Sequence, residues 1–172
     1  MNALPPGYEL SDDPARIDAV AAHAYLTRSY WSPGIPLATV ERAIANSLTV
    51  AVFFAGEQVA MARLLTDFAT HAYLADVYVL EDHRGKGLSK AMIAHLQGRS
   101  DLQGLRRWML FTRDAHALYE QFGWTGTKHP ERLMLRENPE AHARACAPTS
   151  PRSPRTCRKA RGCSTSAAAR AS

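Results

Sequence analysis

Cysteine is scarce in this chain of 172 residues, and all three copies lie near its C-terminal end. They are Cys146, Cys157 and Cys163, and their spacing matches neither a Cys-x-x-Cys pair nor a common zinc pattern. An odd number of cysteines without such a framework argues against a secreted disulfide scaffold. The sequence therefore favours free thiols, no metal centre and a cytoplasmic location.

Long hydrophobic runs are missing as well. No stretch approaches the ~18 consecutive apolar residues that a membrane span requires, and residues 1–7 lack the basic and apolar regions of a signal peptide. We therefore expect no membrane association. The shares of hydrophobic (46%) and charged (22%) residues are those of an ordinary globular protein, and the length suits about one domain.

An excess of positive charge is also lacking where the chain is expected to fold, although the formal net charge is +5. Seven of the 21 basic residues, but only one of the 16 acidic residues, lie in residues 138–172. Residues 1–137 are left with 14 basic and 15 acidic side chains. A nearly neutral domain lacks the basic surface that nucleic-acid binding requires, so we expect no nucleic-acid partner.

The C-terminal segment 138–172 is rich in Ala, Arg, Ser, Pro and Thr and has almost no large apolar residue. Such a composition buries too little surface to offset the entropy of ordering. It predicts a disordered basic tail that follows a domain of residues 1–137. A basic arm that contacts nucleic acid or an acidic partner, or an aberrant extension, would have the same composition.

Hydrophobic periodicity within the domain changes repeatedly between helical and strand-like spacing. Helices are predicted to begin near Pro14, Leu37, Leu88 and Asp114. Strands are predicted at Leu48–Phe54, Val59–Leu65, Ala72–Leu80 and Arg107–Phe111, with a final strand pair within Trp124–Leu135. The resulting order, β-α-α-β-β-β-α-β-α-β, indicates an α+β domain (α/β three-layer) with a mixed, largely antiparallel central sheet flanked by helices.

A glycine-rich turn joins the third of these strands to the following helix. It runs from Arg84 to Ser89 and reads Arg-Gly-Lys-Gly-Leu-Ser. Glycines let the backbone approach a ligand, and N–H groups at a helix N-terminus favour a phosphate. The spacing is neither that of a P-loop nor that of a dinucleotide-binding loop. Taken alone, it equally fits a tight turn with exposed cations.

Two motifs resemble one enzyme family. The spacing Arg84-x-x-Gly87-x-Ser89 resembles the acetyl-CoA signature of the Gcn5-related N-acetyltransferases (GNAT), usually Arg/Gln-x-x-Gly-x-Gly/Ala, with Ser89 as a departure. Residues 115–124 are similar to that family's Ala-x-x-Leu-Tyr-x-x-x-Gly-Phe helix. The resemblance covers residues 7 to 136. It implies the acyl-CoA N-acyltransferase fold and acetyl-CoA as cosubstrate.

The resemblance also implies roles for individual residues. Tyr119 becomes the general acid that protonates the departing thiolate, for which an ordinary pKa of about 10 is expected. Asp76 becomes the first candidate for the general base, because burial in an apolar strand could raise its pKa, although a structural hydrogen-bonded role fits equally well. Asp67 and His71 are the alternatives.

The resemblance also implies which residues bind acetyl-CoA and which contact the acceptor. Contacts to acetyl-CoA are expected from the backbone of the third strand, from the glycine-rich turn and from a residue after the fourth strand, which together comprise Val77, Tyr78, Val79, Arg84, Gly85, Lys86, Gly87, Leu88, Ser89 and Thr112. Thr112 is a second departure from the family pattern, because it occupies the place of a frequent Asn that contacts the cofactor. Acceptor contacts are expected from Tyr30 and Trp31, which fit a core role equally well, and from Asp67.

The sequence as a whole thus predicts an N-acetyltransferase that moves an acetyl group to an amine of a small molecule or peptide by direct attack. A CoA-binding module without catalysis is the alternative. A homodimer is left open.

Overall fold

The computed structural model describes residues 4–138 and 141. Its strands are β1 (Tyr8–Ser11), β2 (Leu48–Phe54), β3 (Glu57–Thr66), β4 (His71–Val79) and β5 (Arg107–Met109). Its α-helices are α1 (Ala19–Leu26), α2 (Leu37–Ala45), α3 (Leu88–Gly98) and α4 (His116–Glu120), and its 3-10 turns are η1 (Pro14–Arg16), η2 (Glu81–His83), η3 (Ser100–Leu102) and η4 (Pro130–Arg132). The three cysteines and nearly all of the predicted tail lie outside the described residues.

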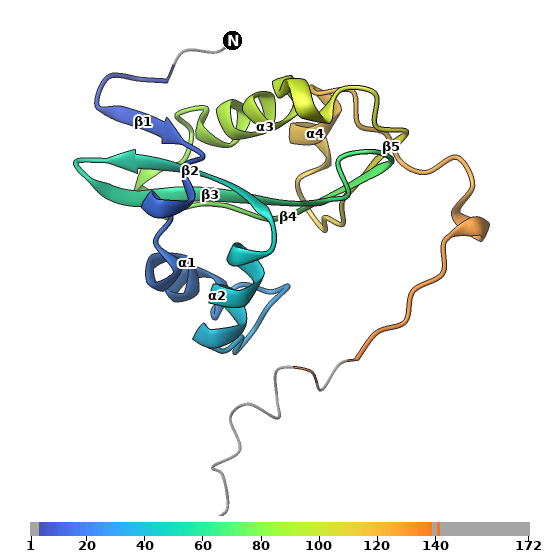
Figure 1. Ribbon diagram of the computed structural model, residues 1–172, viewed down its shortest axis with the longest axis horizontal. Helices are drawn as coiled ribbons and strands as arrows, with labels where there is room; N and C mark the ends of the chain where they lie inside the picture. Colours follow the sequence, from blue (N-terminus) through green and yellow to red (C-terminus); the bar gives the residue numbers. More distant parts are fainter. Residues whose placement is uncertain (1–3, 139–140, 142–172) are drawn as a thin grey trace, which may run out of the picture.

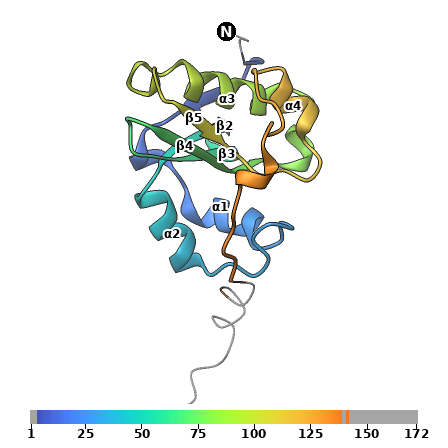
Figure 2. The ribbon, with the colours of Figure 1, turned by 90° about the vertical axis from the view of Figure 1, so that its right-hand side faces the viewer.

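The five strands form one sheet in the order β1-β2-β3-β4-β5. The first four strands are antiparallel to their neighbours, and β5 pairs with β4 in parallel. Helices α1 and α2 cover one face of the sheet, and α3 and α4 cover the other (Figures 1 and 2). This three-layer, largely antiparallel arrangement confirms the predicted fold class.

Two apolar cores lie on opposite faces of the sheet. The larger core packs α3 against the inner strands through buried residues such as Val50, Leu64 and Met92. The smaller core joins α1 and α2 to Met61 and Tyr78. Strands β2 and β3 are buried on both faces, and this explains why they are nearly continuous runs of apolar residues.

The first predicted helix is divided in the structure. Asp13 caps η1 by accepting a hydrogen bond from Ala15 N, and Asp18 then caps α1 by accepting from Val20 N and Ala21 N at 2.8 and 3.0 Å. Each aspartate starts a turn of its own. The helix therefore begins at Ala19 and not at Pro14.

The final predicted strand pair is wrong. The structure has no strand within residues 124–135, where it forms only the turn η4. Every residue from Thr125 to Asn138 is exposed, and the segment leads away from the sheet (Figure 1). Apolar residues such as Leu133–Leu135 show that a segment can form a strand, but a strand exists only where another strand offers it hydrogen bonds.

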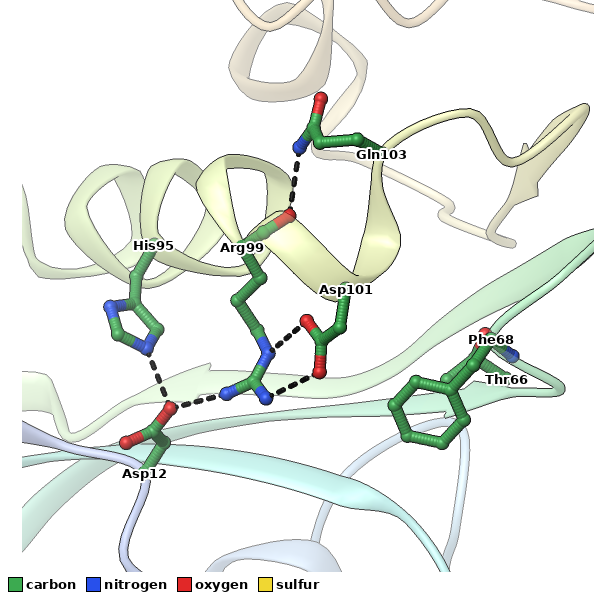
Figure 3. Close-up of polar contacts among 7 residues, drawn as sticks. All are labelled: Asp12, Thr66, Phe68, His95, Arg99, Asp101 and Gln103. Atoms are coloured by element: carbon green, nitrogen blue, oxygen red, sulfur yellow. Dashed lines mark hydrogen bonds and ion pairs between the residues drawn. The ribbon is translucent and has the colours of Figure 1, made fainter.

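A polar cluster fastens the end of β1 to the last turn of α3 (Figure 3). Asp12 accepts hydrogen bonds from His95 Nε2 at 3.0 Å and from Arg99 Nη1 at 2.5 Å, and Arg99 also pairs with Asp101. The hydrogen bond from His95, together with the nearby charges, holds the pKa of the Asp12 carboxyl below its usual value of 3.8. The cluster connects the edge strand to the helix across the layers.

Replacing Asp12 with Asn tests this cluster. The pKa of Asp12 is lowered in the folded state, so its stabilisation is complete above about pH 4 and is lost as the pH falls through the folded-state pKa. Asp12 is partly exposed, so we expect Asp12→Asn to lower the free energy of unfolding by less than about 1 kcal/mol at pH 7. Urea unfolding at pH 7 and pH 3 measures the difference, with Glu41→Gln on α2 as control. A loss that is as large at pH 3 as at pH 7 would contradict the assignment.

Candidate active site where β4 and β5 part

The glycine-rich turn links the end of β4 to the start of α3. Gly85 and Gly87 have φ angles of +74° and +77°, in the left-handed region that glycine adopts without strain. A Cβ atom added at either position would meet no atom within 4 Å. Backbone conformation, and not crowding, therefore requires these glycines, and the space beside them is open to a ligand.

The N–H groups of this turn lack protein acceptors. Among the described residues, no hydrogen bond is made by any N–H from Gly85 to Lys90, and the first helical bond runs from Ala91 N to Gly87 O. Six successive free donors at the N-terminus of an 11-residue helix form a site suited to an anion. The sequence predicted N–H groups in this role, and in the structure these groups have no protein acceptor among the described residues; anion binding by them stays a prediction.

The two cations of the turn serve the turn itself. Arg84 donates from Nε to Val79 O and from Nη2 to Tyr25 Oη and to Glu81, each at 3.2 Å. Lys86 donates to the Asp82 carbonyl at 2.6 Å. These bonds fasten the turn to β4 and α1. The free N–H groups, more than these engaged side chains, are therefore the donors that the turn leaves open to a ligand.

Strand β4 has a free edge beside this turn. Only His71–Tyr73 pair with β5, and no other described strand covers the rest of that edge. Leu80 N donates to Val59 O across the ladder with β3, so the alternation of a strand directs the N–H groups of Val79 and Val77 to the free edge. By the same alternation the backbone of Tyr78 faces β3. Val77 and Val79, two of the three predicted cosubstrate-binding residues of β4, thus have N–H groups on the free edge, while the Val79 carbonyl accepts from Arg84.

A β-bulge interrupts β4 at Asp76. The register with β3 shifts between Met61 and Arg63, and Asp76 has a φ of +52°. A non-glycine residue in this region costs of order 1 kcal/mol. Its carboxylate accepts hydrogen bonds from Arg63 Nε at 2.7 Å and from Trp31 Nε1 at 3.2 Å. These two bonds hold the bulge, so both oxygens of the predicted base already have a donor.

Sequence reasoning did not identify Arg63. Its side chain and that of Asp76 are only 14% and 10% exposed, so the pair is almost buried. One signal was available: Arg63 is a single charge in the apolar strand Val59–Leu65, and such a charge requires a partner. Asp76 is the acidic residue of the adjacent strand.

The loop between α1 and α2 brings aromatic residues to the same place. Trp31 bonds to Asp76, and Tyr30 Oη accepts a hydrogen bond from Arg113 N at 3.2 Å. The guanidinium of Arg113 lies 3.8 Å from the centre of the Tyr30 ring. Tyr30 and Trp31 are 45% and 37% exposed, so they are surface residues and not part of the core.

Tyr119 lies on α4 against the larger core and is only 9% exposed. Burial raises the pKa of its phenol to about 12, with contributions from Tyr30 and Asp114. The sequence led us to expect an ordinary value. Its hydroxyl makes no hydrogen bond to any described residue, which leaves this proton available to a ligand.

Two predicted residues have structural bonds of their own. Asp67 lies in the turn before β4, roughly 25 Å along the strand from the glycine-rich turn. Hydrogen bonds from Thr70 and from the N–H groups of His71 and Ala69 hold the pKa of Asp67 well below its usual range. The Thr112 hydroxyl accepts from Ala115 N at 3.1 Å and so caps the start of α4.

Comparison with known proteins agrees with this geometry. The model of the Acetyltransferase (GNAT) family matches residues 16–124. The chain belongs to the GNAT family. Acetyltransferases of this family use acetyl-CoA as acetyl donor, and the motif resemblance seen in the sequence is confirmed at the level of the family.

The similarity to known proteins covers most of the chain. A crystal structure of a candidate GNAT acetyltransferase from Xanthomonas campestris pv. campestris is 44% identical, covers 82% of this chain and 99% of that chain, and has a TM-score of 0.78. A candidate acetyltransferase from Gibberella zeae is 30% identical over 65% of this chain and 75% of its own. An acetyltransferase structure from Clostridium acetobutylicum, solved with acetyl-CoA, has the same fold at 17% identity and a TM-score of 0.56, over 75% of this chain and 94% of that chain.

Within residues 4–138 and 141, no group of three or more His, Cys, Asp or Glu residues could hold a metal ion. No helix of the described part has the length and apolar character needed to cross a membrane.

Replacing Asp76 with Asn tests the bulge. Asn tolerates a positive φ, so the backbone can be kept while Arg63 loses its charged partner. Removing one member of an almost buried pair should lower the free energy of unfolding by about 3 kcal/mol. Arg63→Met combined with Asp76→Asn should cost less than the sum of the two single changes in urea unfolding. If the losses in the free energy of unfolding from the two single changes add up to that of the double variant, the two residues are not coupled. Arg16→Met, which removes one member of an exposed ion pair, is the control.

Proposed function

We propose that this GNAT protein transfers the acetyl group of acetyl-CoA to an amine of a small molecule or peptide by direct attack. The observation that carries the proposal is the run of six free N–H groups from Gly85 to Lys90, placed beside the free edge of β4. The run suits the pyrophosphate of acetyl-CoA, and the edge offers backbone groups to its pantetheine arm.

Tyr119 is the proposed hydrogen-bond donor to the sulfur. A pKa of about 12 keeps the phenol protonated throughout the physiological range. A thiol has a pKa near 8.5, so complete transfer of the phenol proton to a thiolate is uphill. The first role of Tyr119 is therefore a hydrogen bond that stabilises negative charge as the carbon–sulfur bond breaks. Over the whole reaction the amine loses one proton and CoA leaves as a thiol with one proton more than the thiolate, so the number of protons is unchanged.

Asp76 is the proposed acceptor of that amine proton. Its bond from Trp31 is the longer of the two and comes from an exposed loop residue. An amine that replaces the indole as donor would meet a carboxylate oxygen of Asp76 directly, while the shorter bond from Arg63 stays in place. The exposed rings of Tyr30 and Trp31 would then contact the acceptor.

Proline at position 89 tests the anion site. Ser89 lies in the first turn of α3, where the helix does not use its N–H, so Ser89→Pro removes one free donor while the helix remains. A hydrogen bond to a charged group contributes about 1.5–3 kcal/mol, so we expect acetyl-CoA to bind roughly 10- to 100-fold more weakly. Isothermal titration calorimetry measures the affinity.

Ser89→Ala is the matched control, because it removes the hydroxyl and keeps the N–H. It should bind acetyl-CoA nearly as tightly as the parent chain. The proposal fails if the parent chain shows no binding and no rise in melting temperature with acetyl-CoA. Equal affinities for Ser89→Pro and Ser89→Ala would place the pyrophosphate elsewhere.

Replacing Tyr119 with Phe tests the chemistry apart from binding. We expect kcat to fall about 10- to 100-fold, while the dissociation constant of acetyl-CoA stays within about twofold. A thiol-release assay with a panel of amines measures kcat. Since the pKa of Tyr119 is about 12, the parent chain should show no loss of kcat between pH 7 and 10 from titration of this phenol.

Ser100→Ala removes a hydroxyl in η3, beyond the C-terminal end of α3, and is the control for Tyr119→Phe. Undiminished turnover in Tyr119→Phe would remove the residue as hydrogen-bond donor to the sulfur. Acetyl-CoA binding without turnover on any amine in the parent chain would instead support a CoA-binding module.

A further inference from the structure

Two further aromatic residues lie on the face of the sheet that α1 and α2 cover. Ala72 and Leu74 pack into the larger core on the α3 face, so Tyr73 between them points to the opposite face. Leu110 also belongs to the larger core, and the next residue, Phe111, has its ring 5.8 Å from that of Tyr73. Phe111 is 59% exposed, so this pair of rings lies at the surface and not in the core.

Four aromatic side chains surround the Asp76 carboxylate. The rings of Tyr30 and Trp31 are 4.9 Å apart, and Trp31 donates its hydrogen bond to Asp76. Burial, and then the negative charge of Asp76, raises the pKa of the Tyr73 phenol, so these two side chains are close to each other. Tyr73 in turn contacts Phe111. The four rings, of Tyr30, Trp31, Tyr73 and Phe111, are called the aromatic circuit below.

Arg113 closes the circuit. It follows Phe111 by two residues, and its N–H donates to Tyr30 Oη at 3.2 Å. Tyr30 also contributes, after burial, to the raised pKa of Tyr119, so the proposed donor to the sulfur lies near the circuit. An acceptor with its amine between Asp76 and Tyr119 would therefore place its remaining atoms among these rings.

The exposed ring faces favour one kind of acceptor. Single apolar residues at a surface need no explanation, but several adjoining rings around one charge are typical of a binding surface. Aromatic faces attract a cation, and aromatic rings pack against one another edge to face or with an offset. A protonated amine attached to an aromatic group satisfies both preferences.

The charges of this surface disfavour a carboxylate next to the amine. Arg63 is bonded to Asp76 at 2.7 Å, and Arg113 lies on the Tyr30 ring and pairs with Asp114 at 3.5 Å. Both of these cations are therefore engaged. A carboxylate next to the amine of the acceptor would lie against Asp76 and would be repelled by it.

We propose that the aromatic circuit selects a primary amine that carries an aromatic group and has no carboxylate next to the amine. The aromatic group packs against Phe111 and Tyr73, while the amine bonds to Asp76 in place of the Trp31 indole. The amine nitrogen bonds to the acetyl carbon, the carbon–sulfur bond breaks, and one proton passes from the amine to the released thiol. This substrate class rests on the proposed function.

Three amines test the class in the thiol-release assay with acetyl-CoA. The parent chain should use 2-phenylethylamine with a kcat/KM at least about tenfold above that of propylamine, which lacks the ring. Phenylalanine, which adds a carboxylate next to the same amine, should also be at least about tenfold poorer. A kcat/KM for either comparison amine that equals that of 2-phenylethylamine would overturn the proposal.

Replacing Phe111 with Ala tests the circuit itself. It removes an exposed ring and should lower kcat/KM for 2-phenylethylamine about tenfold, while the value for propylamine stays within about twofold. Phe111→Tyr keeps a ring and should keep the preference. Phe68→Ala, at a 50% exposed phenylalanine in the turn between β3 and β4, is the matched control. An unchanged preference in Phe111→Ala would overturn the proposal.

Equilibrium binding separates this proposal from the proposed function. In calorimetric titrations with free CoA present, 2-phenylethylamine should bind at least about tenfold more tightly than propylamine. If no amine releases thiol, the proposed function fails, and the affinity ratio alone decides the proposal, which equal affinities would overturn. Turnover of all three amines with equal kcat/KM would overturn the substrate class and leave the proposed function in place.

Discussion

The ion pair between Asp76 and Arg63 lies at the point on which the rest of the site depends. It joins two adjacent strands where their register shifts, and it holds Asp76 in a backbone conformation that a residue other than glycine adopts at a cost. Beyond this bulge β4 no longer pairs with β5. Pairing with β5 already ends at Tyr73, so this edge of β4 pairs with no described strand at the bulge and beyond it.

Every other part of the site is placed relative to that free edge. The glycine-rich turn follows the end of β4, and Arg84 fastens it to Val79 and Tyr25. The loop between α1 and α2 reaches the bulge through Trp31 and reaches the segment after β5 through Tyr30. Donors for an anion, aromatic surfaces and a buried phenol thus come from elements far apart in sequence. A rigid sheet between two helical layers holds them together.

Local chemistry explains what the sequence predicted well. Gly85 and Gly87 mark a turn because the required φ angles are almost restricted to glycine. The central strands and the helix α3 follow from apolar periodicity, since each is buried by its neighbours in the fold. Tyr119 was found through a motif. Its raised pKa could not be found in this way, because burial depends on the packing of α4 against the core.

The sequence by itself determined the fold class, the central strands, the helix α3, the glycine-rich turn before it and the family. These features depend on residues close in sequence, whose spacing is directly visible. Only the tertiary structure decided that Asp76 is bonded to Arg63 and Trp31, that Asp67 belongs to a turn distant from the site, and that residues 133–135 lack a partner strand. Each of these depends on contacts between distant segments, and such contacts are set by which edges and faces the packed layers leave free.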